Sequence, residues 1–487
     1  MVSRMLRLLA SAALFSWIEP RSATQIGFPQ AGPDDTQVFQ QLKESEGWQF
    51  LDAYPAQYVA RRLGQEQRIV IDGILDDAAW SEVPFTGSAW MDIAQPLFPD
   101  FVLPAEYSTR VKVRWDADFL YVGAELGEPY VTGVVTGHNQ NLSSPNPIGA
   151  VPYYDNDFEI FIDVSGTNHY YKEFEMNYRN ATYDVFWRVP DDAAGLNSVG
   201  VPCCSDGTCP RWCVNTSFPG YAGSWTMSPR MRTATGKTEH GWAVEIALPL
   251  RATGQSGGLL DGGKDWDRFD PGLGAKFWYM DFARAEHPFF TAQATLFAPL
   301  CSQIKETQPT LLGTDQWSCY FEYVWQSCGG HRYMHNPDTW GFLQFAAAHE
   351  SAECRNVEWP ARYLLSQLYQ AEVAYFQVYG RFSEDIRQLS QPSLCRAEIG
   401  CSSASLVLAL TSFSDIYEID IVADNNATRC VLYAWNGSSS SPDGGPCFSV
   451  SVNVKPPGRD LQIFGTVSEE RYLNVTVAGS EAEPCLV

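Results

Sequence analysis

Residues 153–184 read YYDNDFEIFIDVSGTNHYYKEFEMNYRNATYD, and this stretch decides which fold the sequence predicts. Between positions 157 and 163 the even positions are apolar and the odd positions are mostly acidic, which is the period of two typical of a β-strand. Positions 165–168 read SGTN, which favours a turn, and the alternation resumes over 170–178. The stretch therefore predicts an antiparallel β-hairpin.

Acidic and aromatic side chains crowd this hairpin and the residues just before it. Aromatic rings offer flat apolar faces to a pyranose ring, and carboxylates accept hydrogen bonds from its hydroxyl groups. The combination is what a protein offers a sugar, and Tyr153, Tyr154, Asp155 and Asp157 lie at the entrance of the hairpin. A solvated acidic edge of an ordinary β-sandwich explains the same composition, so the rest of the chain must decide between the two interpretations.

The N-terminus has the pattern of a secretory signal. Arg4 and Arg7 precede an apolar run at 8–18, which is too short to span a bilayer. We expect the signal to occupy 1–23 and the mature protein to be secreted, because no later apolar run reaches about 18 residues. An extracellular place, in a cell wall or matrix, follows from the same expectation.

Sequons, cysteines and charge agree with secretion. The chain has thirteen cysteines, which in an oxidising compartment are expected to form disulfides. Its net charge of −24 argues against nucleic acid as a partner and is compatible with neutral glycans. The six N-x-S/T sequons are expected glycosylation sites. They are Asn141, Asn180, Asn215, Asn426, Asn436 and Asn474.

Many short alternating segments with turn signals between them predict a mainly β protein built on an antiparallel β-sandwich. A helix with an apolar stripe and then a smaller set of strands follow the sandwich. The expected units are the signal 1–23, an extended lead-in 24–67, the sandwich 68–347, a helical connector 357–390 and a β-rich C-terminal domain 395–487.

A Cys-rich insertion interrupts the sandwich at about 191–227. It contains Cys203, Cys204, Cys209 and Cys213, and we expect disulfides to staple it. A zinc site is the alternative, although the spacing C-C-x4-C-x3-C fits no common zinc pattern.

Six motifs together resemble the family 9 carbohydrate-binding modules and their family 9-like relatives, over about 68–347. Any one motif is weak, but the six occur in register along the chain. They are IDGILDDAAW (71–80), VRWDADFLYVGAEL (113–126), NDFEIFID (156–163), YKEFEMN (171–177), WAVEIALPL (242–250) and HNPDTWGFLQF (335–345).

The resemblance implies a β-sandwich that holds a terminal sugar of a polysaccharide between two aromatic rings and contains structural calcium. It places the first ring on Tyr153, with Tyr154 one register away, and gives Glu159 the role of accepting sugar hydroxyls. A basic residue of the family aligns with Glu175, so that contact is replaced in this chain.

The second ring of the family aligns near Met334, with Tyr333 adjacent and Trp325 upstream. For calcium, the oxygen ligands that the sequence offers are turn aspartates. The candidates are Asp116, Asp118, Asp155 and Asp157.

Other function classes stay open from the sequence. Glu159, Glu173 and Glu175 lie on neighbouring predicted strands and are candidates for glycoside hydrolysis, although no nucleophile or metalloprotease motif is present. Related sandwiches bind haem through Met or His, and a purely adhesive role in a matrix is a further alternative. The potential haem ligands are Met176, His169, His287 and Met334.

We therefore expect a secreted, non-catalytic protein that binds a polysaccharide or glycan by aromatic stacking and carboxylate hydrogen bonds. No cofactor other than calcium is expected, and the expected partners are glycans, other glycoproteins or glycan-active enzymes.

Overall fold

The computed structural model describes most of the chain from residue 47 onward. The described residues are 47–87, 90–92, 105–138, 152–187, 190, 230–251, 253, 257–260, 266–287, 321–326, 334–350, 352–389, 414–425, 431–432, 439–440, 447–480 and 485–486. The predicted signal and the Cys-rich insertion lie outside them.

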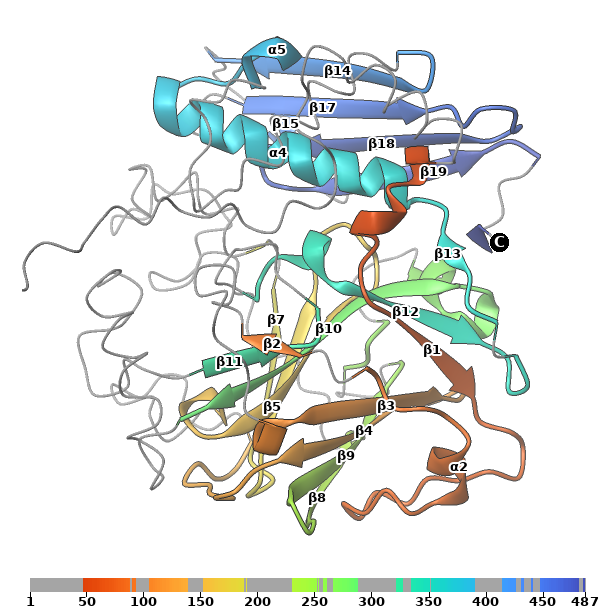
Figure 1. The fold of residues 1–487 in the computed structure, drawn as a ribbon, viewed down its shortest axis with the longest axis vertical. Coiled ribbons are helices and arrows are strands. Elements are labelled where there is room, and N and C mark those ends of the chain that lie inside the picture. Colours follow the sequence, from red (N-terminus) through yellow and green to blue (C-terminus); the bar gives the residue numbers. More distant parts are fainter. Residues whose placement is uncertain are drawn as a thin grey trace, which may run out of the picture.

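β-Strands dominate the described part of the chain (Figure 1). The strands are β1 Gln57–Arg62, β2 Met91–Asp92, β3 Thr109–Trp115, β4 Phe119–Gly127, β5 Asp157–Asp163, β6 Lys172–Asn177, β7 Thr182–Phe186, β8 Arg232–Lys237, β9 Gly241–Pro249, β10 Phe277–Glu286, β11 Phe321–Val324, β12 Gly341–Ala346, β13 Arg355–Asn356, β14 Tyr417–Asp424, β15 Val431–Leu432, β16 Ser439–Ser440, β17 Cys447–Val454, β18 Gln462–Ser468, β19 Leu473–Ala478 and β20 Cys485–Leu486. The α-helices are α2 Ala78–Ser81, α4 Trp359–Tyr379 and α5 Ile386–Leu389, and the 3-10 helices are η1 Gly47–Gln49, η2 Leu51–Ala53, η4 Ala105–Tyr107, η6 Pro152–Tyr154, η8 Trp266–Phe269, η9 Pro271–Leu273 and η11 Pro337–Thr339.

Twelve strands form one curled sheet in the order β7-β6-β5-β10-β12-β1-β3-β4-β9-β8, with β11 and β2 added beside β10. Strand β1 is parallel to both of its neighbours, β12 and β3, whereas the other described strand pairings are antiparallel. The sheet is therefore mixed, which corrects the expectation of a purely antiparallel sandwich. Strand β1, which precedes the predicted start of the sandwich at 68, lies in the middle of the sheet.

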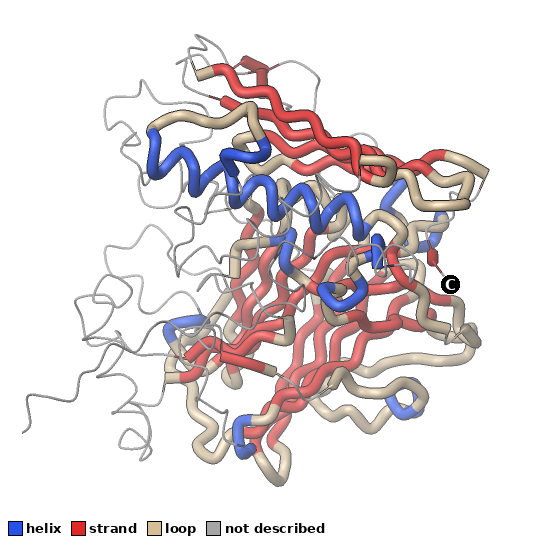
Figure 2. The backbone as a smooth tube through the Cα atoms, turned by 45° about the horizontal axis from the view of Figure 1, so that its top comes forward, coloured by secondary structure: helices blue, strands red, loops and turns tan. Residues whose placement is uncertain are grey.

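The sheet curls over its own apolar face and encloses the main core between its two halves (Figure 2). Period-two alternation supplies this core, because apolar residues of β5 such as Phe158 and Ile160 meet those of β4 and β9. Trp115 and Trp242 lie within it. The mostly β class with sandwich-like layering is thereby confirmed.

A smaller core lies on the outer side of β4 and β9, under the segment 69–83. Trp80 on α2 is fully buried there and donates its indole N–H to Glu245 Oε1 over 2.7 Å. Glu245 Oε2 accepts the backbone N–H groups of Asp72 and Gly73, both at 2.9 Å. Gly73 has φ of +89°, and a Cβ there would lie 2.4 Å from the Thr235 carbonyl carbon, so this turn requires glycine.

A second sheet of four strands, in the order β14-β17-β18-β19, lies at the other end of the molecule with α4 along it (Figure 1). Helix α4 begins with Pro360 in its first turn and ends at Gly380, whose φ of +66° suits a C-terminal cap. The helix shares one apolar cluster with both this sheet and the curled sheet. It is therefore a central layer of the structure and not the connector that the sequence predicts.

Polar contacts fasten the C-terminal unit to the loop between β5 and β6. The Asn168 side chain donates to the carbonyl of Arg471 over 3.1 Å, and Leu473 N–H donates to the carbonyl of Thr167 over 3.0 Å. The Arg471 guanidinium forms a buried ion pair with Asp338 at 2.6 Å. These contacts pack the two β units against each other directly.

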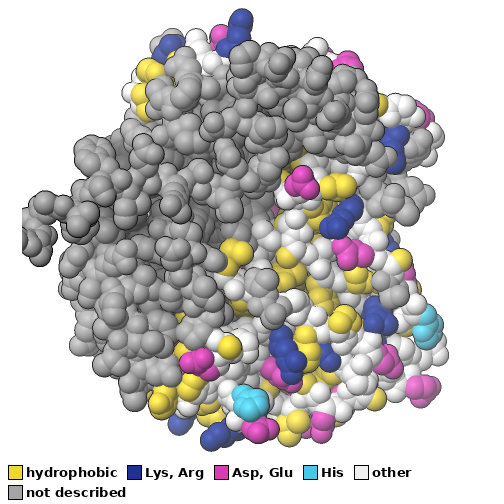
Figure 3. Space-filling view, viewed as in Figure 1, with side chains coloured by type: hydrophobic (Ala, Val, Ile, Leu, Met, Phe, Trp, Pro, Cys, Tyr) yellow, Lys and Arg dark blue, Asp and Glu magenta, His cyan; other side chains and the backbone are white. Residues whose placement is uncertain are grey.

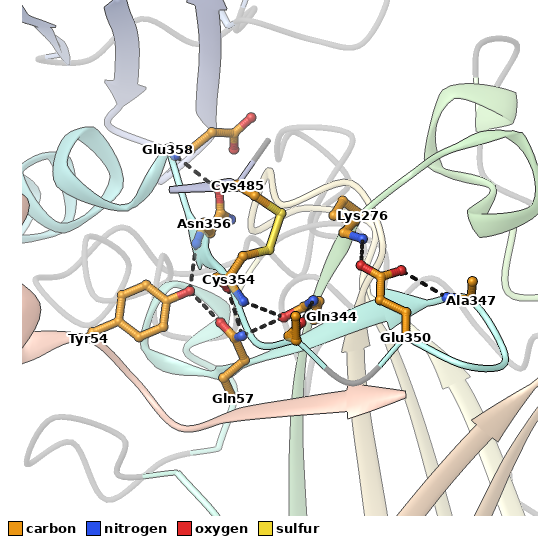
Figure 4. Close-up of a disulfide and its surroundings, with 11 residues drawn as sticks. Tyr54, Gln57, Lys276, Gln344, Ala347, Glu350, Cys354, Asn356, Glu358 and Cys485 are labelled. Carbon is orange, nitrogen blue, oxygen red and sulfur yellow. Dashed lines mark hydrogen bonds and ion pairs between the residues drawn. A yellow bond between two sulfur atoms is a disulfide. The ribbon is translucent and has the colours of Figure 1, made fainter. Parts of the chain in front are cut away.

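A disulfide joins Cys354 and Cys485 and lies beside the short β13–β20 pair (Figure 4). Next to it, Gln57 Nε2 donates to Gln344 Oε1 over 2.8 Å and to the Cys354 carbonyl over 2.9 Å. The Asn356 N–H donates to the hydroxyl of Tyr54 over 2.8 Å. The disulfide therefore anchors the C-terminal end of the described chain beside β1 and β12 of the curled sheet.

Charged side chains of both signs are interspersed on the described surface seen in Figure 3, without one sign gathering into a patch. None of the helices in the described part of the chain combines the length and the apolarity needed to cross a membrane.

Candidate functional site

The hairpin that opens the sequence analysis forms as predicted, because β5 and β6 pair in an antiparallel register. The even positions of β5 enter the main core, so its odd positions lie on the opposite face of the sheet. On that face Glu159 is opposite Glu175, and Asp157 is opposite Asn177. The side chains of Asp157, Glu159, Glu173 and Glu175 are only 0, 5, 6 and 1% exposed. We call these four residues the acidic face.

The carboxyl groups of the acidic face are bonded to one another in pairs. Burial, reinforced by the charge of Asp157, raises the pKa of Glu159 well above its usual range, and Glu159 is hydrogen-bonded to Asp157. Burial and the neighbouring Glu173 raise the pKa of Glu175 in the same way, and these two carboxyls are also hydrogen-bonded. The raised pKa favours the protonated form of these carboxyls, and a protonated carboxyl both donates and accepts a hydrogen bond.

Tyr153 lies next to the acidic face on η6. Its backbone N–H donates to Glu175 Oε2 over 3.0 Å, and its carbonyl lies 2.7 Å from His287 Nε2. Burial lowers the pKa of His287, so the neutral ring donates to this carbonyl. The Tyr153 backbone is thus fixed from two sides, while its side chain is half-buried.

Aromatic rings occupy the other part of the same sheet face. The Trp187 indole N–H donates to Glu173 Oε2 over 2.6 Å, which joins the rings to the acidic face. The ring centroids of Trp187 and His335 are 4.4 Å apart, and Tyr171 stacks on Trp187 at 5.9 Å. Packing among these rings lowers the pKa of His335 to about 3, so its imidazole is neutral. The Tyr171 hydroxyl is hydrogen-bonded to its Nδ1 at 2.7 Å.

The structure brings together some of the predicted sugar-binding residues and separates others. Tyr153, Glu159 and Met334 belong to the same side of the sheet, where Met334 is packed into the apolar cluster beside Trp340. Trp325 instead packs against Phe282 in the main core on the opposite side, so its ring is not available for stacking on a ligand at the acidic face. The side chain of Tyr154 and the whole of Tyr333 lie outside the described part.

Two residues of this face were not singled out from the sequence. His335 reads as a loop residue, yet it packs among rings from β7 and the loop before β6. Tyr171 has the alternation of a strand residue, which indicates its face but not its partners. The HNPDTW motif was the only local signal for His335.

The four predicted calcium ligands lie at two separate places in the sheet. Asp116 closes the β3–β4 turn by accepting the N–H groups of Asp118 and Phe119 at 2.8 and 2.9 Å. Asp155 accepts the N–H of Val135 at 3.0 Å and the amide of Asn177 at 3.0 Å. Among the described residues, no group of three or more His, Cys, Asp or Glu side chains is arranged to hold a metal ion.

The potential haem ligands do not converge either. Met176 is buried in the main core, whereas His169 lies at the interface with the C-terminal unit, 2.7 Å from the carbonyl of Glu470. His287 is bonded to Tyr153 on the opposite side of the sheet from Met176. Of the predicted sequons, Asn180 and Asn474 are exposed, and Asn141, Asn215, Asn426 and Asn436 lie outside the described residues.

Comparison with known families assigns part of the chain to a class. Residues 71–262 match the family model described as carbohydrate family 9 binding domain-like. The chain therefore contains a family 9-like carbohydrate-binding domain, as the resemblance of its motifs predicts. The matched residues end before β10 and β12 and begin after β1, although all three strands belong to the same sheet.

Solved structures of family 9 modules are similar to the chain at low identity. A carbohydrate-binding module family 9 from Caldicellulosiruptor kristjanssonii in complex with cellotriose is 15% identical, covers 61% of this chain and 98% of its own length, and has a TM-score of 0.30. The same module in complex with glucose is 14% identical, covers 61% of this chain and 99% of its own, and also has a TM-score of 0.30. No curated protein matches the chain.

Proposed function

We propose that the chain is a secreted, non-catalytic protein that binds a saccharide at the acidic face of β5 and β6. Tyr153 stacks on a pyranose ring, and the carboxyl groups of Glu159 and Glu175 exchange hydrogen bonds with its hydroxyls. Burial favours the protonated form of these carboxyls, and a protonated carboxyl offers a donor as well as an acceptor to a hydroxyl group. In this arrangement the donor of a protonated carboxyl replaces the donor of the family's basic residue, which aligns with Glu175.

The observation that carries the proposal is the position of Tyr153. Its backbone is hydrogen-bonded directly to Glu175, so an aromatic ring is held at the border of four carboxyl groups on one sheet face. Charged residues are rarely buried in such number without a role, and the matched family binds carbohydrate. The rings of Trp187 and Tyr171 continue the same face as a candidate extension of the site.

The pairing of the carboxyls favours binding over hydrolysis. The two carboxyls of a glycosidase stand about 5–10 Å apart, because a glycosidic bond or a water must fit between them. Here Asp157 and Glu159 are directly hydrogen-bonded, as are Glu173 and Glu175. The carboxyls within each of these two pairs are closer together than that spacing. Secretion is supported by the Cys354–Cys485 disulfide, since structural disulfides are typical of oxidising compartments.

The test is a glycan-array screen and isothermal titration with the full chain, run with and without a calcium chelator. We expect binding at a dissociation constant of about 1–100 μM, typical of shallow stacking sites. Each hit is repeated with the sugar's reducing end reduced by borohydride, and loss of binding then indicates recognition of chain ends.

Variants locate the site. Tyr153→Ala should abolish binding, and Glu159→Gln should weaken it about tenfold. Tyr130→Ala is the matched control, because Tyr130 is an exposed tyrosine that does not belong to the acidic face and should leave binding unchanged. A folded chain that binds no glycan would exclude the function, and binding that survives Tyr153→Ala would move it to another surface.

A further inference from the structure

The four-stranded sheet of the C-terminal unit has an inner and an outer face. Inner residues such as Val450, Val452 and Ile463 are fully buried against α4. Gly465 belongs to this face, since a Cβ at that position would lie 2.6 Å from the side chain of Leu365 on α4. The alternate positions of β18 and β19 therefore lie on the outer face.

Phe464 is an apolar side chain on this mostly polar outer face, where Val422 of β14 is also exposed. Its exposed fraction is 43%, although a phenylalanine of a strand is normally buried. On the β17 side its direct neighbour is Asn453, whose amide already bonds to Glu418 at 3.1 Å and to Gln462 at 2.8 Å. These hydrogen-bonded side chains lie on the β17 side of Phe464. A group that covers the Phe464 ring would therefore approach from the β19 side.

The residues on the β19 side form a sequon. Phe464 is opposite Thr476, and Thr466 is opposite Asn474, so Phe464 and Asn474 are diagonal neighbours on one face. Diagonal Cβ atoms in an antiparallel pair are about 7 Å apart, within reach of a group attached to an asparagine side chain. Asn474 is exposed and is followed by Val475 and Thr476, the pattern for N-linked glycosylation.

We propose that Asn474 carries an N-linked glycan whose first N-acetylglucosamine packs over the ring of Phe464. The apolar face of the sugar covers the exposed ring, and the remaining sugars extend from the sheet into solvent. The inference is independent of ligand binding at the acidic face, and it requires that the chain pass through a secretory pathway that glycosylates asparagine.

Strand β19 gives the glycan a second effect. Among the described strands it is the last in the order β14-β17-β18-β19 (Figure 1). Its outer backbone groups beyond Leu473, whose N–H donates to Thr167, therefore form an edge of the described sheet. Open edges pair readily with other chains, and natural proteins cover them with charges, prolines or bulky groups. A glycan rooted on β19 obstructs this edge.

The experiment uses the full chain from a secretory host that N-glycosylates. Peptide mass spectrometry after deglycosylation in heavy-oxygen water measures the occupancy of Asn474, which we expect to be nearly complete. Hydrogen exchange then compares the β18–β19 amides of the glycosylated chain with those of Asn474→Gln. We expect exchange about fivefold faster in the variant, the size typical of one lost stacking contact.

Trimming separates the first sugar from the rest of the glycan. A chain that retains a single N-acetylglucosamine after endoglycosidase treatment should keep the slow exchange. Phe464→Thr, which retains strand propensity, should remove the difference between glycosylated and unglycosylated chains. Asn180→Gln, at an exposed sequon of the other sheet, is the control and should leave the β18–β19 amides unchanged.

Three results would overturn the inference. The first is an unoccupied Asn474 in a chain whose Asn180 is glycosylated. The second is an effect of the glycan on exchange that is the same with and without the Phe464 ring. The third is dimerisation of the wild-type chain through β19, because the edge would then be covered by a second copy.

Discussion

Glu245 shows how one buried carboxylate organises a local structure. It accepts hydrogen bonds from Trp80 and from two consecutive backbone N–H groups, and these bonds fix the turn before α2 onto β9. Burial raises its pKa while the three bonds oppose the shift. The residue therefore explains why IDGILDDAAW and WAVEIALPL, far apart in the sequence, occur together in one domain.

We predict that Glu245→Gln lowers the free energy of unfolding by about 1–3 kcal/mol, because an amide NH2 replaces one acceptor and faces backbone donors. Urea denaturation measures the change. Glu125→Gln is the control, since Glu125 pairs with Arg110 on the surface and such pairs contribute at most about 1 kcal/mol. Equal losses in the two variants would contradict the role given to Glu245.

The buried carboxyl group of Glu372 on α4 predicts that the stability of the fold depends on pH. Burial raises its pKa from 4.5 to about 8, and one of its oxygens accepts the N–H of Ser383. Because the folded pKa is the higher one, this group's contribution to stability is complete below pH 4.5 and is lost as pH rises to about 8.

Glu372→Gln keeps the acceptor and removes the titration. We expect equal stability of variant and wild type near pH 4.5 and a gain in the variant of up to about 4 kcal/mol at pH 8. Urea denaturation across this range checks it. Glu418→Gln is the opposite control, since hydrogen bonds from Lys455 and Asn453 lower the pKa of Glu418 and its effect fades as pH falls.

The residues of the candidate site differ in how far the sequence reveals them. Alternation along β5 is enough to place Glu159 and Asp157 on one face, because strand period alone sets side-chain direction. It does not reveal that Glu159 bonds to Asp157, or that His335 packs on Trp187, since both depend on folding of distant segments. Trp325 was assigned to the site by its place in the chain, and the curl of the sheet puts it in the main core.

Among the elements, β1 is the one with the greatest consequence for the domain boundary. It lies between β12 and β3, so it joins the two halves of the curled sheet. Its sequence QYVARR has two arginines and only a short alternation, which is why it reads as part of an extended lead-in. The parallel pairing that it makes on both sides requires long crossovers, which no local pattern indicates.

We predict that a chain beginning at residue 68 does not fold, whereas one beginning at residue 47 does, because only the second retains β1. Circular dichroism and the cooperativity of thermal unfolding distinguish the two. The matched region 71–262 alone should fail for the same reason, since it also lacks β10 and β12. A cooperative transition in the chain that begins at 68 would contradict the central role of β1.

Helix α4 illustrates the limit of periodicity. Its apolar positions were expected to form one stripe, and Leu364 and Leu368 are indeed buried. The polar Gln370 and Glu372 are buried too, because the helix is covered on more than one side. An apolar stripe on a helix predicts that one surface packs against that face. It does not predict that a second surface covers the polar side of the helix.

At the scale of the whole molecule, the Cys354–Cys485 disulfide closes α4 and the four-stranded sheet into one covalent loop. The two cysteines are 131 residues apart in the sequence. In the chain-entropy description, a cross-link of that span removes much conformational freedom from the unfolded state.

We predict that the double variant Cys354→Ser, Cys485→Ser loses about 2–4 kcal/mol of unfolding free energy. Replacing both residues avoids a free thiol that would exchange with other disulfides. Limited proteolysis should then release the C-terminal end first, because β20 pairs only with the short β13 in the described structure. Unchanged stability and unchanged cleavage would contradict the anchoring role.

The placement of α4 between the two sheets has a mechanical consequence. Many binding modules are connected to the rest of their protein by flexible linkers, so they move relative to it. Here a short segment that the disulfide and β13 hold leads from β12 to α4, and α4 packs against both β units. A ligand bound beside Tyr153 would keep a fixed orientation relative to the C-terminal sheet. The molecule would therefore act as a rigid spacer that fixes the orientation of a bound ligand, and not as a flexible linker that lets the binding module move.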